Sequence, residues 1–123
     1  MIGITTQGDE FAHKIQCHYE YPNGDKVSTD LAGGGNDARR YPPKTFMLQQ
    51  GEFFSKCTMK HGHWTDNVTL STNNNRSHSW GGPGGGVSVS SIIPDGRRII
   101  AFFGRYGDHL DSFGCYYLEP VSQ

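Results

Sequence analysis

The sequence predicts an all-β domain built from antiparallel strand pairs. Three observations support this class. Runs of alternating polar and apolar residues recur along the chain, and turn sequences rich in Asn, Asp and Gly separate them. No window has apolar residues at helical spacing without interrupting Gly, Pro or strand-forming residues. Short strands at regular intervals are typical of a sandwich, a barrel or a prism.

The predicted strands follow from this alternation, in order along the chain. The first run, KIQCHYEY, places Ile15, Cys17, Tyr19 and Tyr21 on one face, because successive residues of a strand point to opposite sides. The predicted strands are 14–21, 44–49, 52–61, 66–72, 97–106 and 112–120. Three sequences favour tight or left-handed turns: YPNGD (21–25), TNNNR (72–76) and IPDGR (93–97).

Length and charge restrict the classes of protein. The 123 residues fit a single domain, taken as 1–123, and the formal net charge of -1 argues against a nucleic-acid partner held by bulk electrostatics. No apolar run approaches the roughly 20 residues needed to span a membrane. The N-terminal stretch has neither the basic nor the apolar region of a signal peptide. The location is therefore left open between a cytoplasmic protein, a mature or excised domain, and secretion by a route that the sequence does not encode.

The chain has three cysteines, Cys17, Cys57 and Cys115, which cannot all pair with one another. None has the C-x-x-C spacing. Cysteine packs as a small hydrophobic residue, so we expect buried free thiols.

The chain contains an internal repeat and two glycine clusters. The matching positions are 45 residues apart: Gly51 and Gly96, Gly62 and Gly107, Asp66 and Asp111, and the basic residues Lys60 and Arg105. The glycine clusters are GGG at 33–35 and GGPGGG at 81–86. A weaker third copy is expected around YPNGD, which lacks a glycine four residues before Asp25. The repeat predicts three β units, two of which keep a G-x-x-x-D loop.

A G-x-x-x-D loop has the chemistry to bind a pair of hydroxyl groups. Glycine allows a sharp turn, after which backbone N–H groups point outward, and the aspartate adds a carboxylate. An ionised carboxylate only accepts hydrogen bonds and an N–H only donates them, whereas a sugar hydroxyl does both. Hydrogen bonds to charged groups contribute roughly 1.5–3 kcal/mol each. A lone G-x-x-x-D is usually an ordinary turn, so the aligned repetition beside glycine clusters is what favours a binding site.

Two stretches give the chain a resemblance to the jacalin-related lectins. They are GEFFSKCTMKHGHWTDNVTLSTNNNRSHSWGGPGGG and IIAFFGRYGDHLDSFGCYYLEP. The resemblance covers 44–120 well and 8–43 loosely. It implies the β-prism I fold, with three four-stranded antiparallel sheets related by a pseudo-threefold axis, and it implies metal-independent carbohydrate binding without a cofactor.

The resemblance implies a sugar site at the last loop. The side chain of Asp111 would accept hydrogen bonds from sugar hydroxyls, and the backbone N–H groups of Asp108 and His109, which follow Gly107, would donate. The family completes this site with an N-terminal glycine loop. The matching stretch here is TTQGDEF, which has only Gly8, and Asp9 and Glu10 add two acids nearby.

Pseudo-threefold symmetry implies a second site that is more complete by motif. Its residues are Gly62, His63, Trp64 and Asp66, with the partner glycines Gly81, Gly82, Gly84 and Gly85. The remaining cluster, 33–35, would face the degenerate hairpin. An exposed Trp64 would stack against a sugar, whereas Trp80 is expected in the core or at a subunit interface.

Mannose- or glucose-containing glycans and glycoproteins are the expected ligands. The galactose-binding branch of the family uses a free N-terminal glycine made by cleavage, and nothing in the sequence indicates that. Each site should be weak, so two sites per chain or a homo-oligomer such as a dimer would add avidity.

Three alternatives compete with a lectin. Zinc could be held by HGH at 61–63 with His78 and His109, but no spacing fixes a third ligand, and exposed loop histidines are the simpler interpretation. Paired carboxylates could act as in glycosidases, but Asp66 and Asp111 would lie on different sheets, and no hydrolase or P-loop motif is present, so no enzyme is expected. The remaining alternative is a β-prism scaffold, or a protein-interaction or targeting module, with decayed sugar sites.

Overall fold

The computed structural model describes residues 1–8, 12–30, 32–33, 42–61, 65–82, 87–89, 97–106 and 110–118. Within these residues the chain forms β-strands and no helix, and therefore contains no helix that could cross a membrane. All strand pairs are antiparallel and belong to three sheets. The all-β prediction is therefore confirmed.

The first sheet is formed by the N-terminal strands, in the order β3-β2-β1-β5, and β4 pairs with β2 beside β3. Its strands are β1 (Gly3–Gly8), β2 (Ala12–Glu20), β3 (Lys26–Ser28), β4 (Ala32–Gly33) and β5 (Lys44–Met47). Because β3 and β4 pair with successive parts of β2, they act as one interrupted edge strand. The first sheet is thus four strands wide.

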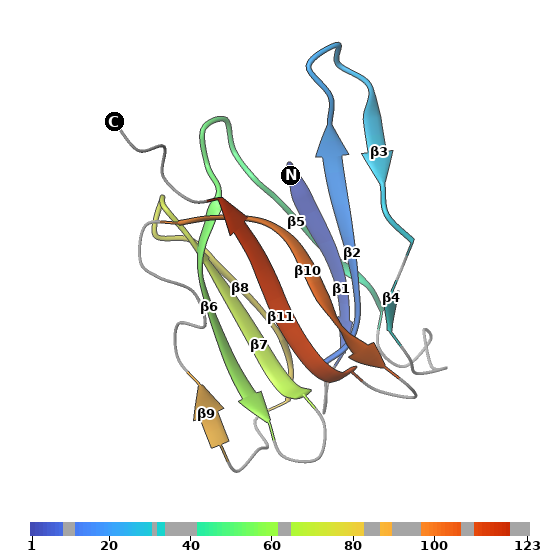
Figure 1. Ribbon diagram of the computed structural model, residues 1–123, viewed down its shortest axis with the longest axis vertical. Coiled ribbons are helices and arrows are strands. Elements are labelled where there is room, and N and C mark those ends of the chain that lie inside the picture. The colour runs from blue at the N-terminus through green and yellow to red at the C-terminus, as the bar shows by residue number, and fades with distance from the viewer. Residues whose placement is uncertain are drawn as a thin grey trace.

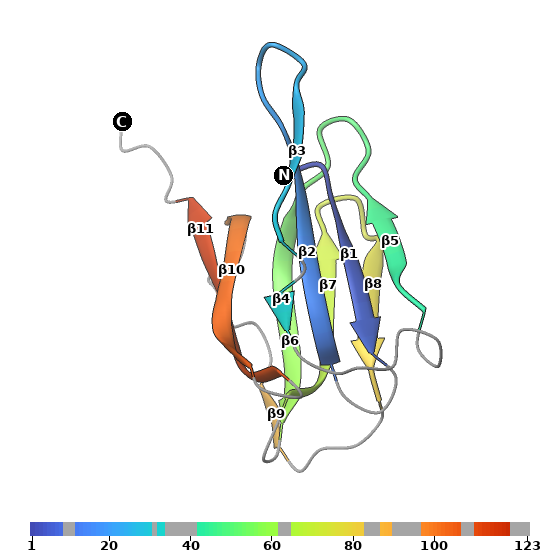
Figure 2. The ribbon, with the colours of Figure 1, turned by 90° about the vertical axis from the view of Figure 1, so that its right-hand side faces the viewer.

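The second and third sheets follow along the chain (Figure 1). The second has the order β8-β7-β6-β9, with β6 (Phe54–His61), β7 (Thr65–Thr72), β8 (Ser77–Gly81) and β9 (Val87–Val89). In the described residues the third sheet consists of β10 (Arg98–Tyr106) and β11 (Leu110–Leu118). Figure 2 shows the third sheet on one side of the molecule, facing strands of the other two.

The 45-residue repeat appears in the strand register. In the second sheet Cys57 pairs with Leu70, and in the third sheet Phe102 pairs with Cys115, 45 positions later on both strands. The irregularity between Lys60 and His61 also recurs, between Arg105 and Tyr106. The two hairpins are therefore structural copies, as the repeat predicts.

The third copy is not where the sequence analysis placed it. The hairpin of β1 and β2 has the same register, because Ile4 pairs with Cys17 as Cys57 does with Leu70. YPNGD is a turn, as predicted, but it joins β2 to β3 at an outer edge of the first sheet, where the Gly24 N–H donates to the Tyr21 carbonyl. The connection equivalent to the G-x-x-x-D loops is thus the one between Gly8 and Ala12.

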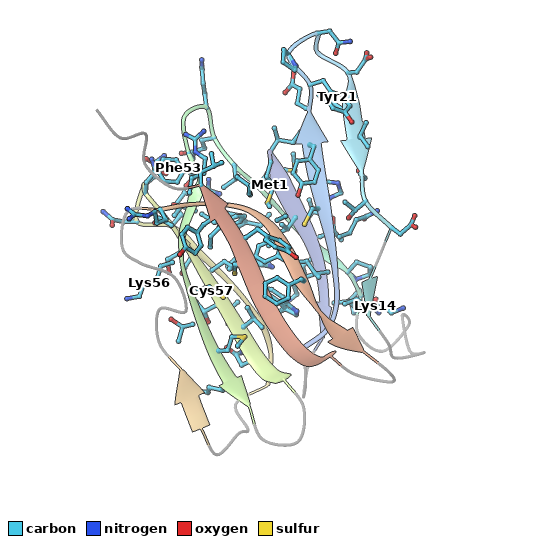
Figure 3. All side chains as sticks on the ribbon, in the orientation of Figure 1. Met1, Lys14, Tyr21, Phe53, Lys56 and Cys57 are labelled. Atoms are coloured by element: carbon cyan, nitrogen blue, oxygen red, sulfur yellow. The ribbon has the colours of Figure 1, made fainter. Side chains whose placement is uncertain are left out.

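The core lies where the inner faces of the three sheets meet. Its buried apolar side chains are Ile4, Ile15, Cys17, Phe54, Cys57, Val68, Leu70, Trp80 and Ile99. Alternation along a strand separates inside from outside: Cys57 points inward, whereas the preceding Lys56 points away from the sheets (Figure 3). The expectation of a core Trp80 is confirmed, since its exposed fraction is 4%.

The cysteines are free thiols, as predicted, and the repeat explains their places. Cys17 and Cys115 occupy the same position in their hairpins as the fully buried Leu70. Cys17 is buried and Cys115 is half-buried. Burial raises the pKa of the Cys17 thiol to about 11. Cys17 and Cys115 thus fill hydrophobic positions of the prism, and the Cys17 thiol is protonated at neutral pH.

A buried carboxylate fixes the connection between the first and second sheets. The side chain of Glu52 is fully buried and forms an ion pair with Arg76, with Oε1 and Nη1 2.6 Å apart. Its carboxylate also accepts hydrogen bonds from the backbone N–H of Gln49 and the hydroxyl of Thr72. Burial would raise the pKa of Glu52, but these three donors outweigh it and hold the pKa below its ordinary value.

We predict that Glu52→Gln destabilises the protein at pH 7 by about 2 kcal/mol, because a buried hydrogen-bonded charge is lost while Arg76 keeps its own. Since the folded pKa is lowered, the carboxylate stabilises the fold above the ordinary value of 4.5 and loses this effect as the pH falls. The difference from wild type should therefore shrink at acidic pH. Urea unfolding at several pH values measures it, with the exposed Glu20→Gln as control. Equal stability of Glu52→Gln and wild type at pH 7 would contradict this.

Candidate functional site

The two aspartates of the G-x-x-x-D loops occupy equivalent places at the turn ends of two hairpins. Asp66 is the second residue of β7 and Asp111 is the second residue of β11. Their backbones belong to the strands, and their side chains lie outside the described part of the structure. The other loop residues predicted for the site also lie outside it: Gly62, His63, Trp64, Gly84, Gly85, Gly107, Asp108 and His109.

The three equivalent hairpins turn at one end of the molecule. In both views β1, β6 and β10 run in a common direction, and each returns as the next strand (Figures 1 and 2). The connections at 9–11, 62–64 and 107–109 therefore begin and end at this shared end. The strand ends that flank the candidate loops thus lie at one end of the molecule.

The second glycine cluster begins beside Asp66. Gly81, at the end of β8, pairs with Asn67, the residue that follows Asp66 on β7. Gly81 has a φ of 100°, a backbone conformation that side chains disfavour, and the next residue, Gly82, is buried. The first cluster begins at the equivalent place, because Gly33 pairs with Lys14 on β2. The register therefore joins each glycine cluster to the hairpin of its own sheet.

Side-chain hydrogen bonds hold the strands that lead to Asp66 and Gly81. The Asn67 Oδ1 atom accepts from the hydroxyls of Thr69 and Ser79, both at 3.3 Å, and these two hydroxyl oxygens are 2.9 Å apart. On the inner side, Trp80 anchors the end of β8 in the core. Asn67 and Ser79 were not predicted from the sequence, although alternating Ser, Thr and Asn residues on neighbouring strands favour such a ladder.

His78 is not an exposed loop residue, which corrects one interpretation from the sequence. It is a half-buried residue of β8, and its Nε2 atom is 2.7 Å from the Thr6 hydroxyl on β1. Burial, with a contribution from Lys44, lowers the pKa of His78. Its imidazole therefore bridges the first and second sheets. Over the described residues, no three His, Cys, Asp or Glu side chains converge as metal ligands do.

The stretch TTQGDEF also differs from the N-terminal glycine loop that the resemblance implies. Residues 5–8 are strand rather than loop, because they belong to β1 and pair with β2. Gly8 ends β1 and pairs with Ala12, as His61 pairs with Thr65 in the second sheet. The stretch is thus the turning point of the first hairpin. By the same register His13, the residue after Ala12, takes the place of Asp66, the residue after Thr65.

The described grooves lie away from these loops. One of about 330 Å³ lies on the first sheet, beside Thr5, His18 and Thr45. Another of about 450 Å³ lies along the β5–β6 connection, beside Met47, Gln49 and Glu52. Neither groove includes a residue predicted to bind sugar.

Comparison with known proteins gives a family and several similar folds. A family model described as "Jacalin-like lectin domain" matches residues 2–116. No curated protein sequence matches significantly. Malaysian banana lectin is similar in structure, with a TM-score of 0.79 and 21% identity over 97% of this chain and 83% of that one.

Two further similar structures are of lectins that bind different sugars. A mannose-binding jacalin-related lectin from Ananas comosus has a TM-score of 0.73 and 23% identity, over 95% of this chain and 81% of that one. A galactose-binding lectin from champedak has a TM-score of 0.80 and 19% identity, over 97% and 92%. At these identities the likeness shows the fold, which is the β-prism of these lectins, and leaves the sugar open.

Proposed function

Because the chain belongs to the jacalin-like lectin family, we propose that it binds mannose- or glucose-type glycans at the GHWTD loop and the glycine cluster that follows β8. The observation that carries this proposal is the pairing of Gly81 with Asn67. This pairing brings Gly81, the first residue of the glycine cluster, next to Asn67, the residue that follows Asp66 on β7. Both parts of a sugar site therefore belong to one sheet.

The proposed recognition uses hydrogen bonds and no covalent step, metal or cofactor. The Asp66 carboxylate accepts from two neighbouring sugar hydroxyls, while backbone N–H groups of His63 and Trp64 donate to sugar oxygens. Gly84 and Gly85, which have no side chains, allow a close approach of the sugar to the backbone. The indole of Trp64 offers an apolar surface for the sugar ring.

A second, weaker site is proposed at Asp111, with Gly107, Asp108 and His109. In the described residues β11 pairs only with β10, so no glycine segment is placed beside it as Gly81 is beside Asn67. We leave Gly8 out of this site, because it ends β1 in the first hairpin. With a few hydrogen bonds in a shallow site, each affinity should be roughly millimolar.

The first prediction about sugar binding concerns the ligand and the sites that it occupies. Mannose added in the presence of EDTA should shift the amide NMR signals of His63, Trp64 and residues 81–86, with smaller shifts at His109. Galactose is the control and should give little change. If neither sugar shifts a signal at tens of millimolar, simple-sugar recognition is wrong, and a glycan array then separates a scaffold from a lectin that needs a larger glycan.

The second prediction compares the two aspartates. Asp66→Ala should weaken mannose binding roughly 10- to 100-fold, because one or two hydrogen bonds to a charged group are lost. Asp111→Ala should cost less, because its site lacks the glycine partner. Titration calorimetry or NMR gives both affinities. An equal loss, or a larger loss for Asp111→Ala, would show that the ranking of the sites is wrong.

The third prediction tests the glycine segment with a strain-matched control. Gly81 has a φ of 100° and Gly24, in the distant β2–β3 turn, has a φ of 93°. Alanine at either position should cost about 1 kcal/mol of stability, because a Cβ disfavours this conformation. Only Gly81→Ala should also weaken mannose binding, by about threefold or more. Unchanged binding in Gly81→Ala would separate the glycine segment from the site.

A further inference from the structure

A recess lies at the end of the molecule opposite the candidate sugar loops. It has a volume of about 150 Å³ and is bordered by the connection that leads into β6 and by the start of β10. β6 begins at Phe54, next to the recess, and ends at His61, next to the GHWTD loop, so about 25 Å of strand separates the two. Figure 3 shows Phe53 and Met1 toward this far end. The recess is therefore separate from the proposed sugar sites.

Apolar side chains form much of the wall of the recess. Met1 and Leu48 pack against the core, and Ile99 belongs to it. Besides Glu52 and Arg98, the lining residues are Met1, Leu48, Gly51, Phe53, Ile99 and Ile100. At Gly51 a Cβ atom would meet no other atom within 4 Å, so the space next to it is open. An apolar space of this volume can hold a molecule of about the size of benzene.

The guanidinium group of Arg98 stands at the recess. Its central carbon lies over the Phe53 ring, 4.5 Å from the centroid. Stacking on an aromatic face orients the planar guanidinium and leaves the N–H groups at its edge for acceptors. No ion pair joins Arg98 to a carboxylate of the described residues, and the side chain is exposed. A ligand can therefore reach this cation.

Glu52 also borders the recess, but its charge is compensated within the protein. The side chain is fully buried, and its carboxylate forms the ion pair with Arg76. The backbone N–H of Gln49 and the hydroxyl of Thr72 donate to the same carboxylate. Glu52 thus leaves the positive charge of Arg98 in place.

The neighbouring groove of about 450 Å³ does not cancel this charge either. It shares Leu48 and Gly51 with the recess, and it is also lined by Glu20 and Lys26. Glu20 and Lys26 are cross-strand neighbours on β2 and β3, so their opposite charges offset each other. The recess therefore combines an apolar space with one uncompensated cation.

We propose that this recess binds a small carboxylate with an apolar body, such as an aryl acid or a short alkyl acid. The carboxylate accepts hydrogen bonds from two N–H groups of Arg98, a pairing that matches the planar fork of the guanidinium. The apolar body covers Phe53 and Leu48 and displaces water from them. Sulfate or phosphate also pairs with a guanidinium, but it leaves these walls uncovered. Binding here is independent of the proposed sugar recognition.

Benzoate is the probe, and amide NMR signals of the wild-type protein measure its binding. The signals of Gly51, Phe53 and Arg98 should shift, with a dissociation constant of roughly 1 mM. Acetate lacks the apolar body and benzyl alcohol lacks the charge, so each should bind roughly tenfold more weakly or worse. Added mannose should leave the affinity for benzoate unchanged. The proposal is overturned if these signals do not move at tens of millimolar benzoate, or if acetate or sulfate binds as tightly as benzoate.

Variants of Arg98 test its role directly. Arg98→Gln should weaken benzoate binding roughly tenfold or more and leave the shifts caused by benzyl alcohol unchanged, which a general loosening of the recess would not do. Arg98→Lys keeps the charge without the fork and should cost about threefold. The matched control is Lys56→Gln, which removes an exposed cation that points away from the sheets (Figure 3). If Arg98→Gln does not fold, Arg98→Lys decides the question. Benzoate binding of wild-type strength in the folded Arg98 variants would show that the site is wrong.

Discussion

The burial of three inner sheet faces against one another is the constraint on which this structure depends. A hairpin alone cannot bury its apolar side, and three hairpins with one register can do so around a common axis. The inner positions must therefore be apolar and of suitable volume, but the type of apolar side chain can differ between the units. One position is filled by Cys17, Leu70 and Cys115 in the three units, and its partner by Ile4, Cys57 and Phe102.

This constraint also places the candidate sugar loops. Because the hairpins share a register and a direction, the strand ends that flank their connections lie at one end of the prism. An edge strand of the first sheet and one of the second sheet each end at the start of a glycine cluster, beside the hairpin of that sheet. Polar contacts then stiffen this frame. His78 bridges to Thr6 between sheets, and Glu52 fixes the connection that leads into β6. The loops are thus carried by strands whose positions do not depend on the loop sequence.

Sequence patterns predicted the fold class, the long strands and the 45-residue repeat, because alternation and spacing are local signals. They missed β1, β3, β4, β8 and β9. The short strands offer too few residues to show a period, and GITTQG has one large apolar residue, so only pairing with β2 and β5 defines it as a strand. The first unit was misplaced because the stretch that connects its two strands does not have the G-x-x-x-D pattern at the equivalent positions. For the candidate site, motif spacing predicted Asp66 and the glycine cluster, whereas the pairing of Gly81 with Asn67 required the structure.

The three units show how one scaffold separates stability from recognition. Substitutions at inner positions keep volume and apolar character, so the units remain superimposable in register. At the hairpin ends the units differ in kind: His13 stands where the others have Asp66 and Asp111. On the outer faces, two units keep hydroxyl ladders and one has Phe103 and Tyr116. Folding alone does not require these differences, because the residues of the shared core do not include these positions. A recognition site on such a scaffold can therefore change without changing the fold that carries it.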